Sequence, residues 1–276
     1  MPLRRVPVGR LAALIAVIVG VWVLAQSGGG PGWRTLGPGL EFSTLRGDRW
    51  CRRGSGEVAV LRLDPALVPL RVRHYLLEPD RRPLGIVEWH QRSGARAVFN
   101  AGQYYPDLSY MGLLVSDGRV VSSRRHPGFQ AVLVASGGAR PRAHVLDLAR
   151  DSLAGPRGGW SQIAQSFMLF DAAGGVRVRR SDKVANRTAV GEDEDGRIVV
   201  AVTEGGYTIS DFAEMLRRSP LGLTHAMSMD GGLEAQLCVE SGDFRYATFG
   251  PWKKGEASEA PGATVTLPAV ISVGTR

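Results

Sequence analysis

Short runs of alternating or clustered apolar residues recur along the chain and predict β-strands. The pattern is clear in residues 57–63 and 70–77, between breaks marked by proline. Further segments of the same kind are expected to be strands, namely residues 95–99, 129–135, 143–148, 167–170, 226–229, 236–239 and 263–273. Two hairpins are also predicted: Asp117-Gly118 joins residues 111–115 to 119–121, and an acidic turn joins residues 187–191 to 197–203.

Only two segments show helical periodicity. Residues 84–92 place Leu84 and Val87 on one face and end at Gly94, a residue typical of helix termini. Thr208 predicts a helix N-cap with Asp211 three residues later, and an apolar face continues to residue 218. Strands outnumber helices, and no repeat of about 20 to 50 residues is visible. The pattern therefore predicts an α+β fold in which residues 41–276 form one domain with a mixed, mainly antiparallel sheet and few helices.

The first 25 residues have the features of an export signal or anchor helix. Three arginines precede a 15-residue apolar run at residues 11–25, the order found in secretory signals. A helix of that length spans about 22 Å, less than the ~30 Å hydrocarbon core, which favours a signal peptide; an uncleaved signal anchor stays open. We expect export to the periplasmic or extracellular face, with membrane contact through residues 11–25 if they are retained. Residues 26–40 are rich in glycine and proline and predict a flexible tether.

The formal net charge of +8 does not by itself indicate nucleic-acid binding. Only three of the 34 basic residues are lysines, and the arginines are scattered along the chain rather than interleaved with aromatic residues. We therefore expect no nucleic-acid partner.

Cysteine and histidine positions leave the cofactor chemistry open. Cys51 and Cys238 could pair after export or remain separate thiols. The five histidines show no zinc-binding spacing. The sequence requires no cofactor, but Asp230, Glu204 and backbone oxygens could hold a divalent metal ion.

Three segments place polar groups at the end of a buried strand, beside glycines that let a ligand approach the backbone: residues 99–102, 186–191 and 229–232. The only two asparagines of the chain, Asn100 and Asn186, lie in the first two segments. Each segment alone is consistent with a side chain that hydrogen-bonds its own turn. The three together indicate where the chemistry is expected.

The same segments, in this order, resemble the phosphodiester glycosidase family over residues 84–273. The resemblance rests on four motifs: Phe99-Asn100-Ala101-Gly102; Gly112-Leu113-Leu114 with Asp117-Gly118-Arg119-Val120; Arg187-Thr188-Ala189-Val190-Gly191; and Ser228-Met229-Asp230-Gly231-Gly232. Members of that family include an enzyme that removes N-acetylglucosamine from the phosphate of mannose 6-phosphate tags. The chain departs from the family pattern at Gln103, which precedes Tyr104 and Tyr105, and at Leu233-Glu234-Ala235.

The resemblance implies an exported hydrolase that cleaves a sugar-1-phosphodiester bond and releases the sugar and a phosphate monoester. Such a reaction needs a carboxylate to activate water or stabilise an oxocarbenium-like transition state. Asp230 is the first choice for that role and Glu204 the second, although Glu204 could equally be a surface acid in a loop.

Binding roles follow from the same chemistry. Arg187 is expected to hold the phosphate by bidentate hydrogen bonds, or else to rigidify the Asp230 turn through a salt bridge. The other expected substrate-binding residues supply an amide for sugar hydroxyls, backbone N–H groups, glycines that let a ligand approach the backbone, or rings that stack on a sugar. They are Asn100, Gly102, Tyr104, Thr188, Tyr207, Gly231 and Gly232. One alternative class is an envelope glycan or sugar-phosphate binding module without turnover. Another is a hydrolase of a different envelope glycan or phosphate polymer.

Overall fold

The computed structural model describes residues 31–154, 159–250, 252–253, 256–257 and 265–274. The predicted signal or anchor segment at residues 1–25 lies outside these ranges, so it stays a prediction. Within them, no helix combines the length and the apolar character needed to cross a membrane.

The described chain is built mainly from antiparallel β-sheets. The largest sheet has seven strands in the order β1 (Arg34–Gly37), β2 (Leu40–Arg46), β3 (Glu57–Leu63), β13 (Ile198–Thr203), β12 (Thr188–Asp193), β14 (Leu223–Ser228) and β11 (Met168–Phe170). A five-stranded sheet follows the order β7 (Arg119–Ser122), β6 (Leu114–Ser116), β10 (Gln162–Ser166), β8 (Ala131–Ser136) and β9 (Arg142–Asp147).

A second five-stranded sheet has the order β16 (Phe244–Phe249), β15 (Gln236–Ser241), β5 (Ala97–Asn100), β19 (Ala269–Val273) and β4 (Leu70–His74), and β17 (Trp252–Lys253) pairs with β18 (Glu256–Ala257). Every strand pair of the described residues is antiparallel. The α+β class with few helices agrees with the prediction. The prediction of a single mixed sheet is wrong, because the described strands form three large antiparallel sheets.

One hydrophobic core joins the three large sheets. Leu61 of β3, Leu133 of β8 and Phe99 of β5 belong to the same buried cluster, and each is at most 3% exposed. Apolar residues on one face of each sheet therefore meet in a shared interior, as expected for packed antiparallel sheets. The strand ends that surround this core are brought close to one another, and the candidate site lies among them.

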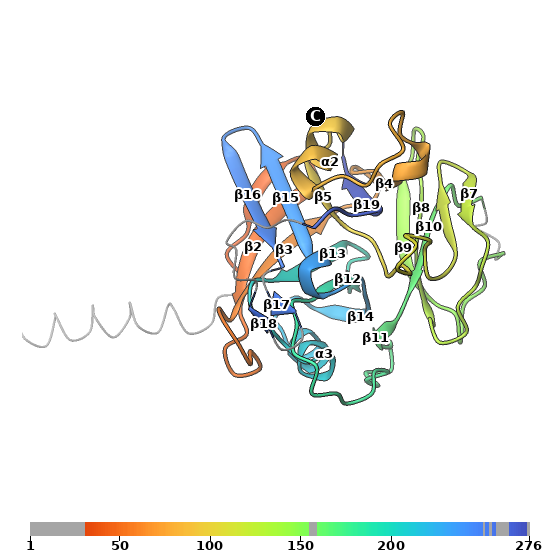
Figure 1. The fold of residues 1–276 in the computed structure, drawn as a ribbon. Coiled ribbons are helices and arrows are strands. Elements are labelled where there is room, and N and C mark those ends of the chain that lie inside the picture. Colours follow the sequence, from red (N-terminus) through yellow and green to blue (C-terminus); the bar gives the residue numbers. More distant parts are fainter. Residues whose placement is uncertain (1–30, 155–158, 251, 254–255, 258–264, 275–276) are drawn as a thin grey trace, which may run out of the picture. The chain divides into compact units, whose positions relative to one another are not determined.

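Two α-helices cover the sheets in the described chain. Helix α2 (Ile86–Ser93) ends at Gly94, whose φ of 60° is the left-handed conformation that glycine favours. Helix α3 (Ile209–Arg217) begins at Thr208, whose hydroxyl accepts a hydrogen bond from the Asp211 N–H at 3.1 Å. Both predicted helix boundaries are thus confirmed. Figure 1 shows α2 beside β5 and α3 beside β14 and β11. Two short 3₁₀ helices, η1 (Tyr75–Leu77) and η2 (Gly232–Glu234), complete the described helical structure.

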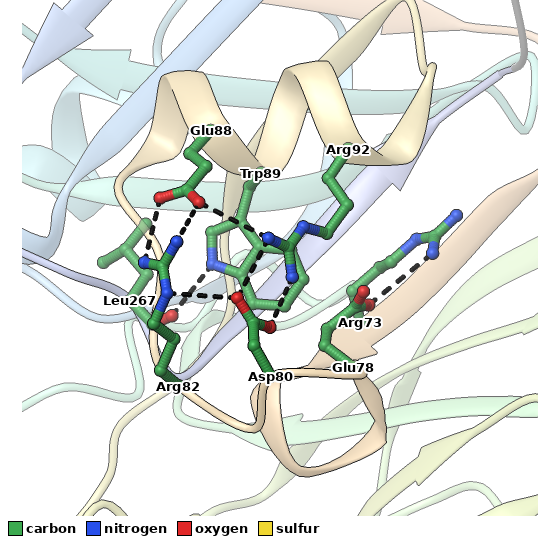
Figure 2. Close-up of polar contacts among 8 residues, drawn as sticks. All are labelled: Arg73, Glu78, Asp80, Arg82, Glu88, Trp89, Arg92 and Leu267. Carbon is green, nitrogen blue, oxygen red and sulfur yellow. Dashed lines mark hydrogen bonds and ion pairs between the residues drawn. The ribbon is translucent and has the colours of Figure 1, made fainter.

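Helix α2 is anchored by one buried aromatic residue and flanked by exposed ion pairs. Trp89 is fully buried and its Nε1 donates to the Leu267 carbonyl at 2.9 Å. Figure 2 shows Asp80 and Glu88 each contacting Arg82 and Arg92 at the edge of the helix. Exposed pairs of this kind contribute about 1 kcal/mol or less each. The buried face of α2, which includes Ile86 and His90 as well as Trp89, therefore attaches the helix to the sheet more strongly than these ion pairs do.

Several strands lie where the sequence pattern did not predict them. The predicted tether at residues 26–40 is wrong from Arg34 onward, because β1 begins there and pairs with β2. Strands β2, β10 and β16 were also missed. Three of the five residues of β10 are polar, and β16 is half-exposed. The hairpin at Asp117-Gly118 is confirmed, with φ values of 47° and 77° at the two turn residues.

The two cysteines lie in different parts of the structure. Cys51 packs against the cluster that contains α3, and its Sγ lies 3.2 Å from the Arg53 carbonyl oxygen. Cys238 lies on β15, in the cluster under α2. No disulfide joins these two described residues, which settles between the two alternatives in favour of separate thiols.

Candidate active site

The three strand-end segments identified in the sequence meet at one place. The Asp230 N–H donates to the Ala101 carbonyl at 3.1 Å, which ties the end of β14 to the end of β5. The Gly232 N–H donates to the Asn186 carbonyl at 3.0 Å, which ties the same turn to the start of β12. The site therefore lies where strand ends from two different sheets converge.

Asn100 holds this junction together. Its Nδ2 donates to the carbonyls of Ala101 and Asp230 at 3.1 and 3.0 Å. Its Oδ1 accepts hydrogen bonds from the Thr188 hydroxyl at 2.7 Å and the Gln236 N–H at 3.2 Å. All four hydrogen-bonding positions of the amide are used, and the side chain is 1% exposed. The expected contact between Asn100 and a sugar hydroxyl is therefore replaced by a role in positioning the Asp230 backbone, and Thr188, 0% exposed, supports it.

Two glycines are required by close approaches at the junction. A Cβ on Gly231 would lie 2.8 Å from the Asn186 carbonyl oxygen and 3.4 Å from Arg187 Nη1. A Cβ on Gly102 would collide with the hydroxyl of Tyr110, which accepts a hydrogen bond from the Gly102 N–H at 3.2 Å. Both glycines let polar groups pack directly against the backbone.

The backbone N–H groups that were expected to bind substrate already have partners. The Gly231 N–H donates to Asp230 Oδ1 at 2.8 Å, and the Gly232 N–H to the Asn186 carbonyl. The expectation that these two groups donate to a phosphate is therefore wrong for this conformation. They fix the shape of the Asp230 turn instead.

Asp230 is half-buried and has an unusual protonation equilibrium. Burial, reinforced by the negative charge of Glu234, raises the pKa of Asp230 to about 7. The Gly231 N–H and the positive charge of Arg187 act in the opposite direction and are outweighed. At neutral pH the carboxyl is divided between its two forms, which suits a group that exchanges protons during catalysis.

Arg187 is held by two backbone carbonyls beside the Asp230 turn. Its Nε donates to the Tyr207 carbonyl at 3.0 Å and its Nη2 to the Lys183 carbonyl at 2.7 Å. Burial lowers the pKa of Arg187 to about 10, so the guanidinium stays charged at neutral pH. No ion pair within 4.0 Å joins Arg187 to Asp230, both of which the structure describes, so the alternative reading as a salt bridge is wrong.

The same contacts limit the hydrogen bonds that Arg187 can donate to a phosphate. Two of its three nitrogens hold the protein backbone, and Nη1 has no hydrogen-bond partner among the described residues. Nη1 faces the Asp230 turn, as its closeness to Gly231 shows. Arg187 therefore presents its charge and the Nη1 protons to the site.

Glu234 and Tyr104 complete the charged centre. Glu234 follows the Asp230 turn in η2, and its Oε2 would lie 3.5 Å from a Cβ placed on Gly232. Burial raises the pKa of Tyr104, and the charges of Glu234 and Asp230 raise it further. An influence of both acids on one hydroxyl indicates that the three side chains share a common environment.

Glu204, the second choice for a catalytic carboxylate, is engaged elsewhere. Its Oε1 accepts a hydrogen bond from the Tyr246 hydroxyl at 2.6 Å. Its neighbour Thr203 faces the opposite way and accepts from the Arg187 N–H at 2.9 Å. Successive side chains at a strand end point to opposite sides, and this alternation turns Glu204 away from Arg187. In the described part of the chain, no three His, Cys, Asp or Glu side chains form a metal-binding group.

The prediction that Tyr207 stacks on a sugar ring is wrong. Its side chain is 0% exposed, and its hydroxyl donates to the Gly56 carbonyl at 3.0 Å. Tyr207 packs against Phe212 of α3, with ring centroids 6.0 Å apart. It serves the site through its backbone carbonyl, which holds Arg187.

Sequence reasoning missed the roles of Gln103 and Glu234. Gln103 Nε2 donates to the Met229 carbonyl at 2.9 Å, and its Oε1 accepts from the Ser166 hydroxyl at 2.9 Å. It thereby braces the strand end that carries Asp230. Both residues are the points at which the chain departs from the family motifs, and that departure was the signal that could have identified them.

Comparisons with known proteins identify the family and the fold. A model of the phosphodiester glycosidase family matches residues 93–265. The comparison with curated proteins gives no match. The fold is similar to the zebrafish N-acetylglucosamine-1-phosphodiester alpha-N-acetylglucosaminidase catalytic domain auto-inhibited by pro-peptide, with a TM-score of 0.59 and 15% identity over 90% of this chain and 87% of that one. A hypothetical protein from Synechocystis is also similar, with a TM-score of 0.53 and 13% identity over 91% of this chain and 64% of that one.

Proposed function

Because this chain belongs to the phosphodiester glycosidase family, we propose that it is a hydrolase that cleaves the bond between a sugar C1 and the oxygen of a phosphodiester. The observation that carries the proposal is the juxtaposition of Asp230, with its pKa raised to about 7, and the charged Arg187 at one strand-end junction. A carboxyl and a fixed cation are the two groups that this reaction needs.

In the proposed reaction, ionised Asp230 acts as a general base. It takes a proton from water as the water oxygen attacks C1 of the sugar. The C1–O bond breaks, its electron pair stays on the phosphate oxygen, and the products are the free sugar and a phosphate monoester. Arg187 Nη1 stabilises the negative charge that grows on the leaving phosphate. A phosphate monoester is a better leaving group than an alcohol, so a separate general acid is less important.

Glu234 tunes this base. Its negative charge contributes to the raised pKa of Asp230, and a carboxylate with a higher pKa is a stronger base. It also adds negative charge where an oxocarbenium-like transition state is positive. Asn100 and Gln103 act as positioning residues, through hydrogen bonds to the carbonyls of Asp230 and Met229, and the Thr188 hydroxyl holds Asn100 in place.

We also propose that the protein works outside the cytoplasm, on a glycan phosphodiester. The support is the arginine-flanked apolar run at residues 11–25, which has the order of an export signal. Retention of these residues after export would tether the enzyme to a membrane.

The direct test uses the full chain and an α-N-acetylglucosaminyl phosphodiester, with free sugar and phosphate monoester measured separately. Equal amounts of both products are expected, and the assay is run both with and without added divalent ions. Binding of the phosphodiester without release of either product, across several sugars, would contradict the hydrolase and favour the binding module.

The Glu234→Gln variant is expected to move the pH dependence of kcat/KM. In the parent, kcat/KM should rise through about pH 7 as Asp230 loses its proton. Removing the charge of Glu234 lowers the pKa of Asp230, so this rise should occur at a lower pH. Relative to its own maximum, the variant should gain roughly two- to fivefold at pH 6.

Glu204→Gln is the matched control, because Glu204 contacts Tyr246 rather than Asp230. Its rise in kcat/KM should stay at the parent pH. A shift in this control and none in Glu234→Gln would reverse the two assignments.

A further inference from the structure

A cavity of about 440 Å³ lies beside the candidate site, and Tyr110, whose hydroxyl contacts Gly102, is part of its lining. It is bordered by η1, by the end of β7 and by the segment that follows Gly102. Its lining includes His74, Tyr75, Asp107, Ser109, Ser122 and Arg124. A cavity of this volume is in the range of sites that bind small organic ligands.

A short hairpin connects this cavity to the candidate active site. Tyr104 and Tyr110 pair as an antiparallel bridge, and the Tyr105 N–H donates to the Ser109 carbonyl at 2.8 Å. Tyr104, at the base of the hairpin, is influenced by the charges of Asp230 and Glu234. Asp107 and Ser109, at its tip, line the cavity.

The hairpin that separates the two places is tight. Residues 105–108 form a turn in which the Leu108 N–H donates to the Tyr105 carbonyl at 2.8 Å, and Tyr110, which pairs with Tyr104, itself lines the cavity. The cavity and Tyr104 are therefore separated by one short hairpin. A substrate cleaved beside Asp230 could extend to the cavity.

The lining favours an anionic, hydroxyl-rich ligand. Arg124 is exposed, and no ion pair within 4.0 Å engages it among the described residues; its guanidinium carbon lies 5.8 Å from the centre of the Tyr105 ring. The Oδ1 atom of nearby Asp107 accepts hydrogen bonds from the N–H and hydroxyl of Ser109, at 3.0 and 2.7 Å, and Asp107 and Arg124 interact through their opposite charges. Serine hydroxyls and an aromatic wall, Tyr75, offer the contacts that sugars use.

We propose that this cavity is a second substrate subsite, which binds a further anionic sugar unit of a glycan phosphodiester through Arg124. The proposal rests on the proposed function and deepens it, because it makes the natural substrate an oligomeric or polymeric sugar phosphate. Arg124 would bind a phosphate or carboxylate on the unit next to the one that is cleaved, as arginine does at other anion sites.

The test compares two substrates in the full chain. One is a methyl phosphodiester of a single sugar, and the other is a dimer of sugar phosphate units with a second phosphate. The parent should show a KM roughly tenfold lower for the dimer, as expected for one added charge-assisted contact. Arg124→Gln should remove this preference and leave the kinetics of the single-sugar substrate unchanged.

Arg125→Gln is the matched control, because Arg125 is also exposed and does not line the cavity. It makes the same change in net charge and should keep the preference for the dimer. A parent with no preference, or equal losses in both variants, would overturn the subsite.

A steric pair of variants gives a second readout. Ser123→Trp fills the mouth of the cavity, whereas Val120→Trp places the same bulk on an exposed position of β7 outside it. Only Ser123→Trp should raise the KM for the dimer.

If the parent cleaves neither substrate, the proposed function fails and the subsite is tested by calorimetry with the dimer as the probe. Binding that weakens in Arg124→Gln and not in Arg125→Gln would support the subsite without turnover. Binding that is absent, or indifferent to Arg124, would overturn it.

Discussion

Replacement of Asp230 by asparagine is expected to abolish turnover and, at the same time, to stabilise the folded protein above neutral pH. Asparagine cannot accept the proton from water, so kcat should fall by about 10³-fold or more. The amide oxygen can still accept the Gly231 N–H that now binds Asp230 Oδ1 at 2.8 Å. The shape of the turn should therefore survive the substitution.

The stability gain follows from the raised pKa of Asp230. In the folded state the pKa is about 7, against 3.8 for the unperturbed group. Between these values the folded state binds more protons than the unfolded state, so the free energy of unfolding falls as the pH rises through this window. The penalty reaches up to about 4 kcal/mol above pH 7, because each pKa unit is worth about 1.4 kcal/mol. Asparagine carries no charge and escapes this penalty.

Urea unfolding at pH 5 and pH 8 measures the effect. The parent should lose stability between the two pH values relative to Asp230→Asn, and the variant should be more stable by about 2 to 4 kcal/mol at pH 8. Asp243→Asn, at an exposed turn position, is the control and should change neither activity nor this pH dependence. Retained turnover in Asp230→Asn would remove Asp230 from the role of base. A difference in stability between parent and variant that is the same at both pH values would contradict the raised pKa of Asp230.

A loss of folding stability that accompanies activity is expected where catalysis requires a carboxyl in an environment that disfavours its charged form. Asn100 and Gln103 hold the Asp230 strand end by hydrogen bonds to its backbone, and the Thr188 hydroxyl holds Asn100 in place. Those bonds offset part of the cost of burying the acid. They also explain why the chain places two amide side chains, Asn100 and Gln103, at one junction.

The sequence predicted the parts of this fold whose signals are local. The Asp117-Gly118 turn and the Thr208 cap are fixed by residues a few positions apart, and both are where the pattern placed them. Strand β10 was missed because its residues, Gln162–Ser166, carry polar groups that bond across to other strands. Gln165, for example, donates to the Phe129 carbonyl at 2.8 Å, a contact that no local pattern encodes.

For the site, the sequence identified the segments but not the task of each side chain. Polar residues beside glycines at strand ends marked all three segments that converge. Burial decides which of them can reach a ligand, and burial depends on partners far along the chain. Tyr207 is enclosed by Gly56 and Phe212, and Glu204 is drawn to Tyr246. These partners are set by the fold. The stacking role predicted for Tyr207 is therefore wrong, and the catalytic role predicted for Glu204 has no support in these contacts.

The second large effect is expected at Arg187. Arg187→Lys keeps the positive charge but loses the planar group that donates from Nε to the Tyr207 carbonyl and from Nη2 to the Lys183 carbonyl. The ammonium would no longer be fixed beside the leaving phosphate, and lysine does not reproduce a guanidinium held in this way. We expect kcat/KM to fall by about 10²- to 10³-fold, the usual cost of removing one aligned group that stabilises transition-state charge.

Three measurements separate this role from a merely structural one. Removing the charge in Arg187→Met should raise the pKa of Asp230, since Arg187 acts to lower it, and so move the rise in kcat/KM to higher pH, opposite to Glu234→Gln. Millimolar guanidinium should partly restore the activity of Arg187→Ala, because it supplies the lost cation. Arg180→Lys, on the preceding exposed segment, should behave as the parent. A loss of activity with no pH shift and no rescue would make Arg187 a support for the Tyr207 and Lys183 segments alone, and the phosphate would then need another cation.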